Sequence, residues 1–362
     1  MRRAAILLLL TSGAVTAQRS KPAFDPETKE GLLIQYIQQE KDPGEKLGYM
    51  EQFAVQYPAH PAIAWVYDQL QPAYLQVKDY DQAMRIGALR LALEPDNLEA
   101  AKISLRAAEA KQSLEDLTKW ADRTWQAAAK IAATPDAKQI QIYAEYCFYL
   151  AAKETTDLKA RLRLLETLEE RDPTSPYAAN LPNDFLQIYR QTGSWDKALA
   201  LAEKTLQSHP NNVDMLMAVA EYHSRKGDNR EKVMGYTNRV IQVLADKARP
   251  AELSEDEWTK RKSQVLAAAN YMGGVASSQR KQFERADAML RAALPQLKEN
   301  EEIEATALYH LGFANYKLAE QGAENRAQDA LKYMRLCGEL KSAYQEQAIK
   351  NVGAIRAEYN LQ

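Results

Sequence analysis

The chain has 362 residues, a formal net charge of -2 and an apolar fraction of 46%. This small net charge creates no large field that would attract nucleic acid or anionic lipid, so bulk charge is not expected to select the partner. With only 14 glycines, 14 prolines and no run of alternating β-branched residues, the composition favours helices over strands. The length suffices for two ordinary domains or one elongated array.

The N-terminal sequence MRRAAILLLLTSGAVTAQ has the organisation of a secretory signal. A short basic start precedes an apolar run from Ala4 to Leu10 and small residues that end at Ala17. We therefore predict a signal peptide at 1–17, a short linker at 18–27, and an exported protein that is periplasmic or secreted. An uncleaved anchor is the alternative, although the apolar run is short for a bilayer. No membrane span is expected in the mature chain.

The chain has two cysteines, Cys147 and Cys337, on separate predicted helices. A bridge between them is chemically feasible in an oxidising compartment. Two cysteines in a chain of this length do not make a disulfide framework, so buried free thiols are expected instead.

Two distant segments repeat one pattern. YLQVKDYDQAMRIGALRLALEPDN (74–97) and YRQTGSWDKALALAEKTLQSHPNN (189–212) both run Tyr, five residues, an aromatic residue, two residues, Ala, eleven residues and Pro, with Asn second after it. A third segment, GGVASSQRKQFERADAMLRAAL (273–294), has similar spacing. The pattern predicts two helices joined by a tight turn in each segment. Its landmark residues are Ala83 and Pro95, then Ala198 and Pro210, then Gly274, Phe283 and Ala286.

The stretch ALYHLGFANYK (307–317) completes a resemblance to the tetratricopeptide repeat family. Its pair Leu311 and Gly312 is similar to the Leu-Gly of that family's first helix, in a unit of about 34 residues with a small residue opening the second helix. The resemblance implies an all-α fold, a right-handed α-solenoid of stacked antiparallel helix pairs that share a continuous core. The corresponding residue of the second helix recurs at Leu47, Ala83, Leu117, Ala160, Ala198, Val233, Ala286 and Ala330. The predicted units are 28–61, 64–97, 98–131, 141–174, 179–212, 213–247, 267–300 and 305–344, followed by a capping helix at 345–359.

Some units depart from the pattern. Ser254 and Glu257 form a capping box, which predicts a long helix beginning near Ser254. Gln71 stands where a small residue is usual, and Pro72 is expected to kink or break the first helix of its unit. The unit at 98–131 has no Gly or Pro landmark and is recognised only by its register.

Small residues mark the expected contacts between the two helices of a unit. Gly312, Gly274 and Ala220 lie where the first helix should meet the second, and a larger side chain there would hold the helices apart. We therefore assign these positions, together with Leu311, to packing.

No motif for catalysis or metal binding stands out. The histidines His60, His209, His223 and His310 lack metal-ligand spacing, and no P-loop, G-x-S-x-G or dinucleotide fingerprint is present. Ser278 and Lys281 match S-x-x-K without its companion motifs, at an expected turn. We predict no enzymatic activity, no cofactor, no metal and no nucleic-acid partner. The basic residues Lys260, Arg261, Lys262, Arg280, Lys281 and Arg285 are read as a solvated, charge-balanced surface because Glu255, Asp256 and Glu257 stand beside them.

The resemblance also implies a concave surface lined by first helices, where a protein or peptide ligand would bind. Tyr309, Phe313 and Tyr316 share one helical stripe, as aromatic interface anchors would. Packing of the same stripe beneath a neighbouring helix is the alternative. The expected ligand-facing residues are Tyr309, Phe313, Tyr316, Lys317, Tyr271, Val275, Met217, Glu221 and Arg225, and in the early units Leu32, Tyr36, Asp68, Lys102 and Arg106.

These observations predict a non-enzymatic scaffold or adaptor of the bacterial envelope, binding a peptide or helix of another protein in its groove. Two alternatives stay open. The first is an α-solenoid enzyme acting on cell-wall or glycan material, with carboxylates supplied by different helices. The second is a glycan-binding protein that uses the aromatic groove. A pocket with two facing buried carboxylates would favour the enzyme, and an open groove would favour binding.

Overall fold

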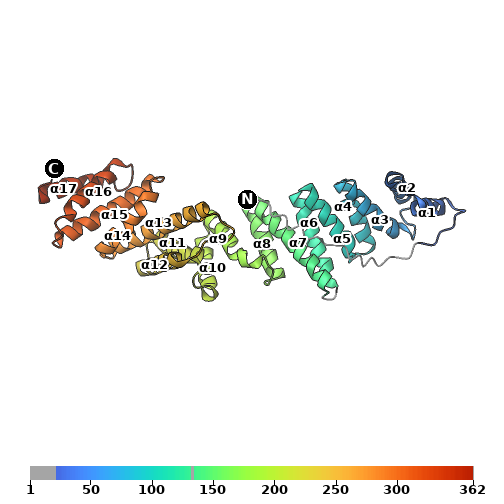
Figure 1. The fold of residues 1–362 in the computed structure, drawn as a ribbon, viewed down its shortest axis with the longest axis horizontal. Helices are drawn as coiled ribbons and strands as arrows, with labels where there is room; N and C mark the ends of the chain where they lie inside the picture. Colours follow the sequence, from blue (N-terminus) through green and yellow to red (C-terminus); the bar gives the residue numbers. More distant parts are fainter. Residues whose placement is uncertain (1–21, 132–133, 362) are drawn as a thin grey trace. The chain divides into compact units, whose positions relative to one another are not determined.

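The computed structural model describes residues 22–131 and 134–361, and the predicted signal peptide lies outside these residues. In this part of the chain all regular structure is helical. Two compact units divide the chain, with residues up to 179 in unit 1 and residues from 180 in unit 2. The predicted all-α fold of stacked helix pairs is confirmed within each unit (Figure 1).

Unit 1 contains four helix pairs. Each helix packs against the next one along the chain, and a single apolar core runs through the unit. Its helices are α1 (Lys29–Gln39), α2 (Pro43–Gln56), α3 (Ile63–Gln76), α4 (Tyr80–Leu93), α5 (Leu98–Lys111), α6 (Leu114–Lys130), α7 (Pro135–Glu154) and α8 (Leu158–Arg171).

Unit 2 contains four further pairs and a last single helix. A short 3-10 turn, η1 (Ala178–Asn180), leads into it, and a second one, η2 (Leu294–Gln296), follows α14. Its helices are α9 (Leu181–Gln191), α10 (Trp195–Ser208), α11 (Val213–Lys226), α12 (Arg230–Asp246), α13 (Glu255–Gln279), α14 (Phe283–Ala293), α15 (Glu301–Glu320), α16 (Arg326–Glu339) and α17 (Gln345–Tyr359).

Short polar side chains fix where most helices begin. An Asp, Asn, Ser or Thr at the N-cap accepts a hydrogen bond from a backbone N–H of the first turn, which would otherwise lack a partner. At α13 the cap is the predicted capping box, in which Ser254 and Glu257 each bind the other's backbone N–H. Side-chain caps are provided by Thr28, Asp42, Asp79, Asn97, Ser113, Thr134, Asp157, Asn212, Asn229, Ser254 and Asn300.

The glycines of the first helices lie at close helix crossings, as the sequence suggested. A Cβ at Gly274 would lie 2.6 Å from Leu290 Cγ, and one at Gly312 would lie 2.9 Å from Met334 Cγ. Ala220 and Leu311 are fully buried. The landmark alanines Ala83, Ala198 and Ala286 are also buried, and Pro95 and Pro210 each follow the end of a helix by two residues.

The expectation for Pro72 was wrong in one respect, because α3 continues through this residue to Gln76 without a break. Pro72 lies in the last turns of the helix, so the lost backbone donor affects only the bond to the carbonyl one turn earlier. Contacts with α4 and α5 hold the helix on either side of it. Another difference concerns α7, which begins at Pro135, six residues before the predicted unit start at 141.

Both cysteines are buried and free. Burial raises the pKa of the Cys337 thiol to about 11 and raises that of Cys147 as well, so both stay protonated near neutral pH. The expectation of buried thiols is therefore confirmed. No helix in the described ranges is long and apolar enough to cross a membrane.

Candidate functional site: the inner face of unit 2

One face of unit 2 is formed by the first helices of its pairs. Besides contacting its sequence neighbours, α11 contacts α9 and α13, and α15 contacts α13 and α17. These contacts place the first helices of neighbouring pairs side by side. We call the surface that α9, α11, α13, α15 and α17 form together the inner face. Most predicted ligand-facing residues lie on α11, α13 and α15.

Tyr309 of α15 is partly covered by the segment that leads into α17. Its ring stacks on that of Tyr344, with centroids 4.5 Å apart and planes 26° apart. The neighbouring ring of His310 meets both tyrosines edge to face. Offset stacking of this kind stabilises and orients both rings. Tyr309 is therefore held in place by the chain itself, and only part of its ring is accessible.

The other two rings of the stripe also have partners. Phe313 meets Phe283 edge to face at 6.0 Å, and Tyr316 meets Tyr359 of α17 at 6.4 Å and 90°. The ammonium group of Lys317 lies 5.0 Å from the centre of the Tyr316 ring. All four predicted residues of α15 are half-buried. The stripe is thus partly covered by other side chains of the chain and partly accessible.

On α13, Tyr271 and Val275 are half-buried beside the α15 stripe, packed against the same apolar cluster. Burial raises the pKa of Tyr271, so its hydroxyl stays protonated. Because α13 and α15 contact each other, these two side chains and Phe313 lie on adjoining helices of the inner face. Predicted residues from two successive helix pairs of unit 2 therefore pack against one apolar cluster here.

Met217 was assigned to the ligand-facing set wrongly. It is only 5% exposed and belongs to the apolar core between α11, α12 and α13. The two other residues predicted on α11 have partners within the chain. Glu221 accepts a hydrogen bond from Arg190 Nε at 2.9 Å, and the guanidinium of Arg225 lies 4.1 Å from the centre of the Trp195 ring.

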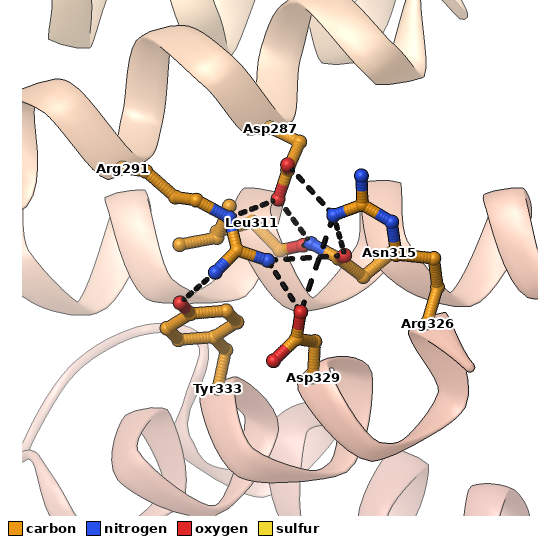
Figure 2. Close-up of polar contacts among 7 residues, drawn as sticks. All are labelled: Asp287, Arg291, Leu311, Asn315, Arg326, Asp329 and Tyr333. Carbon is orange, nitrogen blue, oxygen red and sulfur yellow. Dashed lines mark hydrogen bonds and ion pairs between the residues drawn. The ribbon is translucent and has the colours of Figure 1, made fainter.

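A polar cluster, unrecognised in the sequence, joins α14, α15 and α16 around the buried residues Asp287 and Asn315 (Figure 2). The carboxylate of Asp287 is its centre, with a side chain only 8% exposed. It accepts hydrogen bonds from Arg291 at 2.7 Å, Asn315 at 2.6 Å and Arg326 at 3.0 Å. Arg291 also binds Asp329 at 2.6 Å. Two arginines and two carboxylates balance in charge, so the cluster is satisfied internally.

The residues of the S-x-x-K pattern lie at the C-terminal end of α13. Ser278 Oγ lies 3.0 Å from His310 Nδ1, and both residues are buried. Lys281 occupies a left-handed turn after α13, with φ of 60°. Burial lowers the pKa of His310 to about 4, so the imidazole is neutral at physiological pH. In the described part of the chain no cluster of His, Cys, Asp and Glu is arranged to hold a metal ion.

The basic residues near α13 are tied to neighbouring helices. Arg261 binds Asp214 at 3.3 Å, and Arg280 binds Glu231. Arg285 donates to the amide oxygen of Asn238. These pairs connect α13 to α11 and α12, and α14 to α12.

The first helices of unit 1 contact one another in the same way, α3 with α5 and α5 with α7. Of its predicted residues, Leu32, Tyr36 and Arg106 are exposed. Asp68 accepts a hydrogen bond from Arg90 at 2.5 Å, and Lys102 pairs with Glu99 at 2.5 Å. An open cavity of about 350 Å³ is lined by Leu75, Gln76, Lys78, Tyr80, Arg106, Glu109 and Ala110.

No family model and no curated protein matches the sequence. Among solved structures, the chain is similar to a MamA protein with 17% identity and a TM-score of 0.32, over 54% of this chain and 98% of that one. It is also similar to a tetratricopeptide repeat protein from Parabacteroides merdae, with 12% identity and a TM-score of 0.29, over 79% of this chain and 98% of that one. The P58(IPK) TPR domain shows 10% identity and a TM-score of 0.33, over 91% of this chain and 98% of that one.

The helix pairs of the chain itself carry the assignment. Gly274 and Gly312 lie at close crossings of α13 with α14 and of α15 with α16. The chain is built of stacked helix pairs, the fold that the resemblance to the tetratricopeptide repeat family implies.

Proposed function

We propose that the protein is a non-enzymatic scaffold that binds a segment of another protein on the inner face of unit 2. The observation that supports this is that half-buried Tyr271 and Val275 of α13 and Phe313 of α15 pack against one apolar cluster. Apolar and aromatic side chains that are partly exposed and already fixed by their neighbours make good interface anchors, because little rotamer freedom is lost on binding.

The ligand that fits this surface is an extended peptide or an amphipathic helix with one or two apolar residues. Its apolar side chains would lie on Val275 and the accessible edge of Phe313. Lys317, which sits over the Phe313 and Tyr316 rings, would face a polar or acidic position beside them.

The cellular setting proposed for this binding is the bacterial envelope. This part of the proposal rests on residues 1–17, whose basic start, apolar run and small-residue end are typical of a cleavable signal. Expression in a bacterial host, followed by osmotic-shock fractionation and N-terminal sequencing, tests it. A periplasmic product beginning at Gln18 supports export, and an uncleaved product in the cytoplasm refutes it.

Binding is tested with a random peptide library displayed on phage and selected on the purified protein. Enriched peptides are then titrated against Phe313→Ala, Val275→Ala and a control, Leu336→Ala. The control removes an apolar side chain that is 38% exposed on α16, away from the inner face. Loss of an anchor typically costs about 2 kcal/mol or more, so both inner-face variants should bind about thirtyfold more weakly.

The control should bind the peptides as the unchanged protein does. Circular dichroism melts establish that each variant is folded. A library that yields no enriched peptide, or peptides that bind all variants equally, would refute the inner face as the binding surface.

A further inference from the structure

A small apolar hollow lies on the surface of unit 2, between α11 and α12. Its volume is about 190 Å³, and we call it the α12 dimple. The hollow is wide open to solvent, so an apolar side chain lying in it would be covered on its inner side by the chain. It is lined by Leu216 of α11 and by Lys232, Gly235, Tyr236 and Arg239 of α12.

Gly235 opens this hollow, and packing within the chain does not require it. It lies inside α12, where glycine is an unfavourable helix former compared with alanine. A Cβ built on Gly235 would meet no atom within 4 Å, whereas one on Gly274 would meet Leu290 at 2.6 Å. A helical glycine with open space above it allows another backbone or side chain to approach closely.

The floor of the hollow is apolar and its rim is cationic. Leu216 is only 3% exposed and forms the floor, with the half-buried ring of Tyr236 beside it. Lys232 lies three residues before Gly235 and Arg239 four residues after it, so both flank the hollow along one side of the helix.

Both cations keep capacity for a further anion. The nearest carboxylate to Lys232 among the ion pairs of the described residues is Glu203, at 3.7 Å. Within the described ranges, the hydrogen bonds found for Arg239 go to the neutral amide oxygen of Asn211, at 2.7 and 3.1 Å. A carboxylate on a partner would therefore accept a hydrogen bond from Arg239 between two charged groups, which is stronger than the bond that the neutral amide oxygen of Asn211 accepts.

We propose that the α12 dimple is a second docking site, which takes one apolar side chain of a partner segment flanked by acidic residues. The apolar group fills the space above Gly235, and carboxylates on either side meet Lys232 and Arg239. The site does not depend on the function proposed above, because its lining residues on α11 and α12 differ from Tyr271, Val275 and Phe313.

The test uses methyl-labelled protein and synthetic peptides, with the δ-methyl signals of Leu216 followed by NMR. The probes are acetyl-DEDLEDE-amide, the same peptide with alanine in place of leucine, and the basic peptide acetyl-KRKLKRK-amide. The first should shift the Leu216 signals in a saturable way. The alanine peptide should bind about tenfold more weakly, and the basic peptide should leave the signals unchanged.

Gly235→Leu fills the hollow and should abolish the response to the first peptide. Gly353→Leu is the matched control, since Gly353 is an exposed helical glycine of α17 that also has no atom within 4 Å of its Cβ position. It should bind like the unchanged protein, and melting curves show that both variants fold.

Several results would overturn the proposal. Among them are an absence of shifts at about 5 mM peptide, equal affinity for the leucine and alanine peptides, a response to the basic peptide, and unchanged binding by Gly235→Leu. Shifts of the Leu216 signals with protein concentration alone would assign the hollow to a second copy of the chain instead, and would also overturn it.

Discussion

Replacing Gly274 by alanine tests whether the helix pairs of unit 2 are held by close backbone approach. The new Cβ would lie 2.6 Å from Leu290 Cγ, 2.9 Å from Leu290 Cδ2 and 3.2 Å from Leu290 N. Leu290 is fully buried, and two of these atoms are a branch point and a backbone atom, so no simple rotation relieves the clash. Overpacking of this kind costs about 1 to 3 kcal/mol.

The same substitution at Gly235 is the control, because both glycines lie inside helices of unit 2 and gain about 0.5 to 1 kcal/mol of helix propensity as alanine. Gly235 has open space above it, so Gly235→Ala should raise stability by that amount. The free energy of unfolding of Gly274→Ala should be lower than that of Gly235→Ala by about 1 to 3 kcal/mol. Urea denaturation followed by circular dichroism measures both.

A double-mutant cycle with Leu290→Ala identifies the cause. The space left by Leu290 would accept the new methyl group, so the two changes should couple favourably by about 0.5 to 3 kcal/mol. Equal stability of the two glycine variants, or additive effects in the cycle, would show that α13 and α14 do not cross at Gly274.

Three other features of the core give measurable predictions. Burial lowers the pKa of His310 from 6.5 to about 4, so the folded state binds the proton more weakly than the unfolded state does. The free energy of unfolding should therefore be highest above pH 6.5 and should fall by about 3 kcal/mol between pH 6.5 and pH 4. His310→Gln should flatten this part of a stability profile measured by urea titration. Asp287→Ala leaves the arginines of its cluster without their central carboxylate and should cost about 3 kcal/mol by the same assay, whereas a change below 1 kcal/mol would mean that solvent replaces it. Arg171 stacks 4.8 Å from the centre of the Trp125 ring and 4.7 Å from that of Phe148, so Arg171→Lys should lower the melting temperature although the charge is kept, and an unchanged melt would contradict the stacking.

The unit that departs most from the repeat pattern shows where reading the sequence failed. Gln71 occupies a position where a small residue is usual, yet it is 1% exposed and donates hydrogen bonds to Ser104 Oγ and the carbonyl of Ala100, both at 2.9 Å. The space for it comes from Gly87 on the second helix, whose Cβ would lie 2.4 Å from Gln71 Nε2. The small residue has moved to the facing helix. A pattern that follows one helix at a time cannot reveal such an exchange.

Features that depend on neighbouring residues in the chain were predicted well. The capping box at Ser254 fixed the start of α13, because both of its hydrogen bonds form within one helical turn. The burial of Ala83, Ala198, Ala286, Gly274 and Gly312 followed from their positions in the repeat. Met217 was misplaced because its burial depends on tertiary packing against α12 and α13, which the pattern of α11 alone does not reveal.

The stretch ALYHLGFANYK combines both outcomes within one helix. Its period correctly placed Leu311 and Gly312 at the helix crossing, where both are buried. It did not show that Asn315 would bind a buried carboxylate of α14, or that a tyrosine from the segment after α16 would stack on Tyr309. Such partners are brought close by tertiary packing. A residue that has one, such as Asn315 or Tyr309, contributes to the fold, so changing it would alter stability as well as any ligand contact. On α15, Phe313 is partly accessible but also packs against Phe283, so Phe313→Ala should weaken peptide binding and lower stability together. Loss of peptide binding at a temperature well below the melting transition of Phe313→Ala would separate the two effects.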